Sequence, residues 1–172
     1  MLNQELEAAL NEQLGGELYS SHLYLSMSAY CESVNMPGAA HWFRMQADEE
    51  RTHALKFFDH IVDRGGRVTL GVIEAPPTGF ASLLDAFEQA LQAERNVSAA
   101  IDRLASMAVA QGDHAAGAFL QWFVTEQVEE ESSAQKVLQS LKLVGKDGAG
   151  LLMLDRELAQ RVFTPPAATA QA

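Results

Sequence analysis

Residues 37–64 of this 172-residue chain, PGAAHWFRMQADEERTHALKFFDHIVDR, contain the most informative pattern for its fold. Its apolar residues recur every three or four positions, and this period predicts one continuous helix. Pro37 suits the first helical turn, where its missing N–H is not needed, and Gly65-Gly66 predicts the C-terminal end. On the apolar stripe, a glutamate at mid-helix, Glu50, interrupts the run Phe43, Ala47, Ala54, Phe57 and Ile61. The helix therefore carries a carboxylate where a core residue is expected.

The same period continues outside this stretch and predicts an all-α chain. Ser82 with Asp85 resembles a capping arrangement, and Asp113 is a suitable N-cap residue. We expect helices at 3–33, 37–64, 82–111 and 113–144, with a shorter fifth helix at 149–162. We further expect one domain over 1–162 and a flexible tail, rich in Pro and Ala, over 163–172.

Connection lengths indicate the topology. Segments 33–36 and 112–113 are short, so they join antiparallel neighbours. Segment 65–81 has 17 residues and reaches at most about 56 Å when extended, whereas a helix of 28 residues is about 42 Å long. This segment can run the whole length of a bundle and start the next helix parallel to the previous one. The sequence therefore predicts a four-helix bundle with one long crossover, the ferritin-like arrangement, plus a short C-terminal fifth helix.

Composition excludes several classes of protein. Lys and Arg total 12 and Asp and Glu total 23, a net charge of −11 that argues against a nucleic-acid partner. The single cysteine, Cys31, excludes an intramolecular disulfide and a zinc site built on several thiolates. The first residues have no signal-peptide pattern, and the apolar runs are shorter than the roughly 20 residues of a membrane span. We therefore expect a cytoplasmic protein with no membrane partner.

Three other predicted helices also carry a glutamate on the apolar stripe near mid-helix: Glu17, Glu94 and Glu130. Two like charges 4 Å apart repel by about 4 kcal/mol at an effective dielectric constant of 20. No Lys or Arg lies on these stripes, so a metal cation is the expected counter-charge. His53 follows Glu50 by three residues, and this Glu-x-x-His spacing on one helix face is how bundle proteins build di-iron sites. A nitrogen ligand among carboxylates favours iron, manganese or zinc over calcium.

Each of these signals has a simpler interpretation when taken alone. A lone Glu-x-x-His usually lies on a solvated face, the run at 129–131 is typical of an exposed surface, and Glu94 could extend to solvent. The conjunction of four helices, four inward glutamates and one correctly spaced histidine favours a metal site over a plain helical bundle.

Three stretches resemble bacterial non-haem ferritins, and the resemblance extends over about 1–162. They are ELYSSHLY at 17–24, EERTH at 49–53 and QWFVTEQVEE at 121–130. The resemblance implies a first iron site of Glu17, Glu50 and His53. It implies a second iron site of Glu94 and Glu130, bridged by Glu50.

The resemblance also implies roles for residues around the two iron sites. Gln127 lies beside the second iron, and Tyr24 lies next to the dinuclear centre. Tyr24 either supplies an electron or only donates a hydrogen bond to a carboxylate. Glu49, Glu126 and Glu129 match a third iron site, and a solvated acidic patch is the alternative.

Three positions differ from the motifs of other ferritin-like families, and these differences reduce the number of functions to consider. Ser133 follows Glu130 by three residues, where bacterioferritins and rubrerythrins have a second Glu-x-x-His histidine. Arg51 stands where bacterioferritin has its haem-ligand methionine, so we expect no haem. No Lys or Arg precedes Arg44, unlike the basic arm of many DNA-binding mini-ferritins.

The resemblance implies an iron-storage protein with ferroxidase activity, which oxidises Fe(II) with dioxygen and stores ferric mineral inside a homo-oligomeric cage of 24 subunits. One alternative is a di-iron or di-manganese oxygenase or peroxidase that acts on a small molecule. A further alternative is a helical scaffold with an acidic core and no catalysis.

Overall fold

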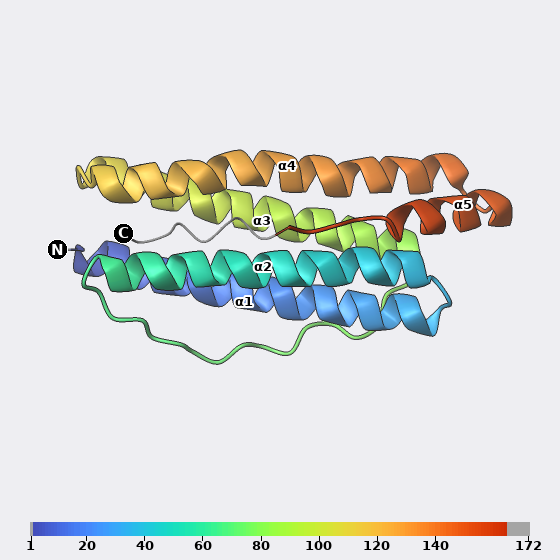
Figure 1. The fold of residues 1–172 in the computed structure, drawn as a ribbon, viewed down its shortest axis with the longest axis horizontal. Helices are drawn as coiled ribbons and strands as arrows, with labels where there is room; N and C mark the ends of the chain where they lie inside the picture. Colours follow the sequence, from blue (N-terminus) through green and yellow to red (C-terminus); the bar gives the residue numbers. More distant parts are fainter. Residues whose placement is uncertain (1, 165–172) are drawn as a thin grey trace.

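The computed structural model describes residues 2–164, and within them the chain forms five helices and no strand. The helices are α1 (Gln4–Ser33), α2 (Pro37–Asp63), α3 (Leu83–Ala110), α4 (His114–Val144) and α5 (Gly148–Leu158). The first four are long and lie side by side as a bundle, with α5 at one end (Figure 1). None of the described helices is long and apolar enough to cross a membrane.

The predicted all-α bundle with a short fifth helix is confirmed, and the ends of the four long helices agree with the prediction to within a residue. The prediction for the fifth helix is wrong at its C-terminal end. The helix ends at Leu158 rather than at 162, and residues 161–164 are not helical. Most of the tail predicted at 163–172 lies outside the described residues.

Side-chain caps explain where four of the five helices begin. Asn3 accepts a hydrogen bond from the backbone N–H of Glu5, and Ser82 accepts one from Asp85. Asp113 and Asp147 play the same part for α4 and α5. Each cap satisfies a backbone donor that has no partner inside the helix.

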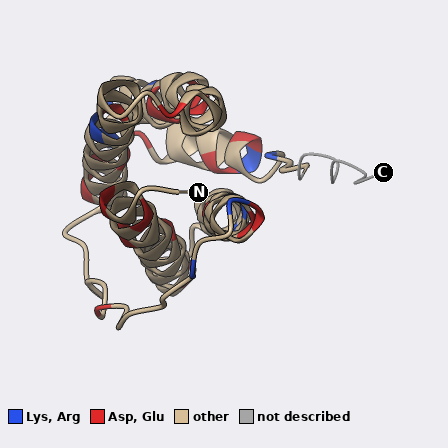
Figure 2. Cartoon of the chain, turned by 90° about the vertical axis from the view of Figure 1, so that its left-hand side faces the viewer, with Lys and Arg blue, Asp and Glu red and all other residues tan. Residues whose placement is uncertain are grey.

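The long connection between α2 and α3 runs along the outside of the bundle, next to α1, and brings the chain back to the end where α2 began (Figures 1 and 2). Helices α2 and α3 are therefore parallel, as the reach of the segment predicted. The connection is fixed to α1 at two levels. The side chain of Asn11 bonds both the Arg67 carbonyl at 3.0 Å and the Thr69 N–H at 2.7 Å, and Ser26 donates to the Pro77 carbonyl at 2.6 Å.

The hydrophobic core is divided into two parts. One part contains Tyr24, Phe43 and Phe87, and the other contains Leu10, Phe57 and Phe123. Within α1, α2, α3 and α4, the glutamates expected on the apolar stripes lie between positions that belong to the two parts. The bundle thus has a polar layer across its middle with apolar packing on both sides, and this layer carries the candidate site.

Candidate metal centre

Two helices bring the first group of ligand-type side chains together. Glu17 comes from α1, and Glu50 and His53 come from consecutive turns of α2. One ligand atom from each residue lies within 4.8 Å of the others, and the three side chains are at most 2% exposed. We call Glu17, Glu50 and His53 the inner group. These are the three residues that the resemblance assigned to a first iron site, and the structure brings them together.

Buried polar atoms of the inner group lack the partners that a folded core normally supplies. Within the described part of the chain, no hydrogen bond reaches Oε2 of Glu17, either carboxylate oxygen of Glu50, or Nδ1 of His53. Oε1 of Glu17 does accept a hydrogen bond from Gln13, at 2.9 Å. Because an unpaired buried carboxylate is costly, four orphaned ligand atoms in one place fit a site that binds a cation.

Burial controls the protonation of the inner group. Desolvation raises the pKa of Glu17 to about 7, and desolvation together with repulsion from Glu94, Glu17 and Glu130 raises the pKa of Glu50 well above its usual value. Desolvation lowers the pKa of His53 to about 4, so its imidazole is neutral near pH 7. A neutral imidazole has a free lone pair for a metal.

Aromatic side chains hold the His53 ring in place. The ring centroids of Trp122 and Phe123 lie 5.4 and 5.7 Å from that of His53, both in edge-on geometry. These apolar neighbours from α4 account for the desolvation of the imidazole and limit its rotation.

Glu94 in α3 and Glu130 in α4 are the buried carboxylates expected at the second iron site. Charge repulsion from Glu94 contributes to the raised pKa of Glu50 and of Glu130, so the three carboxylates face a common space. Both oxygens of Glu94 accept hydrogen bonds, from the Tyr24 hydroxyl and from Gln127 Nε2. Glu94 is not among the closely spaced ligand groups found in the described residues.

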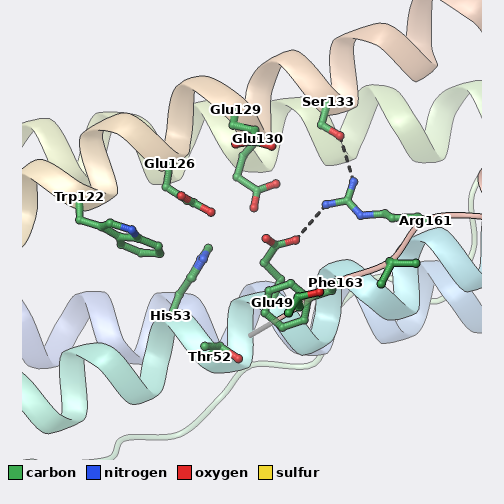
Figure 3. A pocket seen from close by; sticks show the side chains of 12 residues that line it. Glu49, Thr52, His53, Trp122, Glu126, Glu129, Glu130, Ser133, Arg161 and Phe163 are labelled. Carbon is green, nitrogen blue, oxygen red and sulfur yellow. Dashed lines mark hydrogen bonds and ion pairs between the residues drawn. The ribbon is translucent and has the colours of Figure 1, made fainter. Parts of the chain in front are cut away.

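Glu130 instead belongs to a second closely spaced group. Ligand atoms of Glu49, His53, Glu126 and Glu130 all lie within 4.8 Å of one another, and we call these residues the outer group. They line a pocket of about 260 Å³ in which their side chains point toward one another (Figure 3). His53 is common to the inner and outer groups, so the two potential sites are adjacent.

The expected third-site residues are only partly assembled. Glu49 and Glu126 lie in the outer group, whereas Glu129 lines the pocket but is exposed and stands outside that group. Burial is the main cause that raises the pKa of both Glu49 and Glu126.

Tyr24 and Gln127 both contact Glu94. The Tyr24 side chain is fully buried and donates its hydroxyl hydrogen to Oε1 of Glu94. Burial and the nearby carboxylates raise the pKa of Tyr24 well above its usual value, so the phenol stays protonated. Gln127 donates to both the Glu94 carboxylate and the Glu94 carbonyl, at 3.1 and 3.2 Å.

The sequence-based reasoning missed three residues that contact the ligands. Gln13 donates to Glu17, Gln46 donates to Oε2 of Glu130 at 2.8 Å, and Arg161 forms an ion pair with Glu49 at 2.9 Å. Gln13 could have been found, because it precedes Glu17 by four positions on the same helix face. Gln46 and Arg161 contact carboxylates 84 and 112 positions away, and no local spacing indicates such pairs.

Comparison with known proteins agrees with this geometry. The family model described as "Ferritin-like domain" matches residues 7–144. A protein named bacterial non-heme ferritin from Bacteroides fragilis is 42% identical over 161 residues, which is 94% of this chain and 100% of that protein. The protein of the same name from Staphylococcus epidermidis is 41% identical over 163 residues, 95% of this chain and 98% of that protein.

Solved structures of ferritins are also similar to this chain. An open-pore ferritin from the archaeon Archaeoglobus fulgidus superimposes with a TM-score of 0.93 at 44% identity, covering 94% of this chain and 100% of that one. An engineered closed form of the same ferritin superimposes with a TM-score of 0.94 at 46% identity, covering 95% of this chain and 100% of that one.

Proposed function

Because the chain belongs to the ferritin family, we propose that it stores iron and that it oxidises Fe(II) with dioxygen at the inner group and the carboxylates beside it. The observation that carries this proposal is the set of orphaned ligand atoms of Glu17, Glu50 and His53 in the middle of the bundle. Relatives named bacterial non-heme ferritin support iron as the metal.

The donor set fits iron as a substrate. Carboxylate oxygens with one imidazole suit a metal of intermediate hardness, softer than calcium and harder than the metals that thiolates bind. Glu50 is the residue best suited to bridge two ions, because neither of its oxygens has a hydrogen-bond partner among the described residues. Glu17 and His53 would be terminal ligands of one Fe(II), and Glu94 and Glu130 would bind the other.

Two Fe(II) each give one electron to one dioxygen, which with two protons is reduced to hydrogen peroxide, and the charge of each iron rises from +2 to +3. Carboxylates tolerate this change because they can rearrange between terminal and bridging modes. Gln46 and Gln127, hydrogen-bonded to Glu130 and Glu94, hold the second pair of ligands in position. The apolar parts of the core pack on both sides of the polar layer.

We also propose that 24 copies assemble into a shell that holds ferric mineral. An exposed apolar surface between α1 and the long connection supports contacts between copies. Leu70 is 65% exposed and Val72 95% exposed, and both line a groove that also includes Leu18 and Ile73. A lone subunit would leave this surface in water.

Fe(II) loading of the metal-free assembly tests the proposal. Two Fe(II) per chain are added without oxygen, oxygen is then admitted, and ferric absorbance is followed; the experiment is repeated at large excess. We expect rapid oxidation at two per chain and soluble mineral at excess. The Glu50→Gln variant should lose the rapid phase, and Glu32→Gln, an exposed glutamate of α1, should keep it.

The possible results separate the hypotheses. Rapid oxidation followed by precipitation at excess, with a native mass far below that of a shell, would favour a di-iron oxygenase. Oxidation no faster than in protein-free buffer would refute the ferroxidase proposal.

A further inference from the structure

The segment that follows α5 places a positively charged side chain beside the outer group. After Leu158 the chain turns and runs back along the bundle (Figure 1), and Arg161 enters the pocket from this segment (Figure 3). Its Nη2 lies 2.9 Å from Oε2 of Glu49, and its Nη1 donates to Ser133 Oγ at 2.9 Å. The guanidinium also lies 4.6 Å from the centre of the Trp42 ring.

These contacts hold Arg161 on three sides. The Arg161 carbonyl also lies 2.8 Å from Nε2 of His41, so the backbone is fixed together with the side chain. The side chains of Arg161 and Glu49 are 19% and 13% exposed, well below the exposure of ordinary surface ion pairs. A restrained and largely desolvated charge pair has a stronger effect than a mobile surface pair.

The pocket has an excess of negative charge. Four carboxylates line it, and among the described lining residues Arg161 is the one with a permanent positive charge. Arg161 pairs with Oε2 of Glu49, and the same Glu49 carboxylate belongs to the outer group. A divalent cation at the outer group would therefore share Glu49 with a guanidinium of the same sign.

We propose that Arg161 is an internal counter-cation that lowers the affinity of the outer group for divalent metal and so keeps that group weaker than the inner group. Repulsion between the guanidinium and a bound ion makes the free energy of metal binding less favourable. When no ion is bound, the ion pair with Glu49 reduces the repulsion among the outer carboxylates. Among the described residues, no Lys or Arg pairs with Glu17 or Glu50, and the His53 imidazole that lies 3.3 Å from Glu50 is neutral near pH 7. The inference rests on the proposed metal binding at both groups.

Zinc binding to the assembled, metal-free protein tests this role, because Zn(II) binds without oxidation. We compare wild type, Arg161→Gln, Arg161→Lys and Arg156→Gln by calorimetry at two salt concentrations. Arg156 is an exposed residue of α5, so its variant makes the same charge change outside the pocket. We expect Arg161→Gln to tighten the weaker zinc site by about tenfold or more, as expected for charges a few ångströms apart in a partly desolvated place. Arg156→Gln should match wild type.

Two further variants separate charge from geometry. Arg161→Lys keeps the charge but not the forked contact to Glu49 and Ser133, and its weaker zinc site should stay within about threefold of wild type. In a Glu49→Gln background, Arg161→Gln should have little further effect, because the proposed influence passes through Glu49. All variants should keep the native mass and the tighter zinc site of wild type.

Other results overturn the inference. If Arg161→Gln lowers the zinc affinity of the outer group, Arg161 orients Glu49 for metal binding and does not oppose the bound ion. If Arg161→Gln leaves both sites unchanged, the ion pair has no part in metal affinity. Absence of zinc binding in every protein, including wild type, would contradict the proposed metal centre itself, whereas tight inner binding without an effect of Arg161 would refute this inference alone.

Discussion

Asp155 of α5 accepts a hydrogen bond from the backbone N–H of Gly38, the second residue of α2, at 3.0 Å across 117 positions of sequence. Its other oxygen accepts one from the N–H of Ala39, at 2.9 Å. Helix α2 begins at Pro37 after Met36, which makes no side-chain cap hydrogen bond. A carboxylate from the last helix therefore caps the helix that carries Glu50 and His53, and its negative charge is favourable at that helix N-terminus.

Replacing this cap should destabilise the fold. Asp155 is 7% exposed, and Asp155→Ala would leave two buried N–H groups without an acceptor. We expect a loss of about 2–3 kcal/mol in the free energy of unfolding, measured by denaturant or thermal unfolding of the metal-free protein. Glu157→Ala, an exposed change on the same helix, is the control and should cost less than about 0.5 kcal/mol. Equal stability of both variants would show that the cap is dispensable.

Gly38 itself should tolerate no side chain. A Cβ added there would lie 1.7 Å from the backbone carbonyl oxygen of Asp155, a clash that only movement of α5 can relieve. We expect Gly38→Ala to lower the melting temperature and to loosen α5, seen as faster hydrogen exchange over Gly148–Leu158. Gly117→Ala is a control within α4, because its added Cβ meets no atom within 4 Å. Protection of α5 equal to wild type in Gly38→Ala would contradict the close approach.

The metal-free protein should lose stability as the pH rises through neutrality. Burial raises the pKa of Glu17 from 4.5 to about 7. Because the pKa of Glu17 is higher in the folded than in the unfolded state, the protonated carboxyl contributes to the free energy of unfolding. This contribution is complete below about pH 4.5 and is lost as the pH rises through about 7. His53 opposes this loss only below about pH 7.5, where the unfolded imidazole still binds protons, because the pKa of His53 lies near 4 when folded and 6.5 when unfolded.

Glu17→Gln should reduce this pH dependence, and the buried carboxyls of Glu50 and Glu130, whose pKa values are also raised, should account for what remains. The glutamine keeps an acceptor for Gln13 and can donate to the unpartnered Glu50. At pH 8.5 we expect the metal-free variant to be about 1–3 kcal/mol more stable than wild type, with a smaller difference at pH 6. Thermal unfolding after chelator treatment measures both, with Glu32→Gln as the matched surface variant. A difference that does not grow with pH would show that Glu17 is not the group responsible.

Metal binding should release protons. Burial and repulsion from neighbouring carboxylates, Glu94 among them, raise the pKa of Glu50 and Glu130 well above the usual range, and a bound cation requires both carboxylates in the charged form. Anaerobic Zn(II) calorimetry in buffers of different ionisation enthalpy should give about one or more protons released per chain at pH 6.5. Fewer should be released at higher pH, as Glu17 ionises before metal is added. Release that is zero at every pH would mean that these carboxylates are already charged.

Tyr24 offers a test of electron donation against hydrogen bonding. Tyr24→Phe removes the hydroxyl that donates to Glu94, while Gln127 still donates to the other oxygen. If the hydroxyl acts by positioning Glu94, the variant should lose about 1 kcal/mol of stability and still oxidise two Fe(II) per chain at a rate within about threefold of wild type. Tyr30→Phe, near the long connection, is the control. A large loss of the rapid phase with unchanged zinc binding would instead favour Tyr24 as an electron donor.

Local patterns in the chain were enough to predict most of the fold. A helix repeats every 3.6 residues, so the apolar stripe and the placement of Glu50 with His53 on one face follow from short spacings, as do the caps at Ser82 and Asp113. The reach of the 65–81 segment was sufficient to predict parallel α2 and α3. The end of α5 was less predictable, because apolar spacing continues past Leu158 into a segment that packs on the bundle without being helical.

The five helices, their topology, and the four mid-helix glutamates with one histidine could be predicted from spacing along the chain. The partners of those carboxylates became known from the folded structure. Glu94 is hydrogen-bonded by Tyr24 and Gln127, Glu130 lies in the outer group, and Glu49 is paired with Arg161. The physical reason is that spacing along a helix specifies a face, whereas contacts between positions about 30 to 110 residues apart depend on the packing of the helices and on where the last one ends.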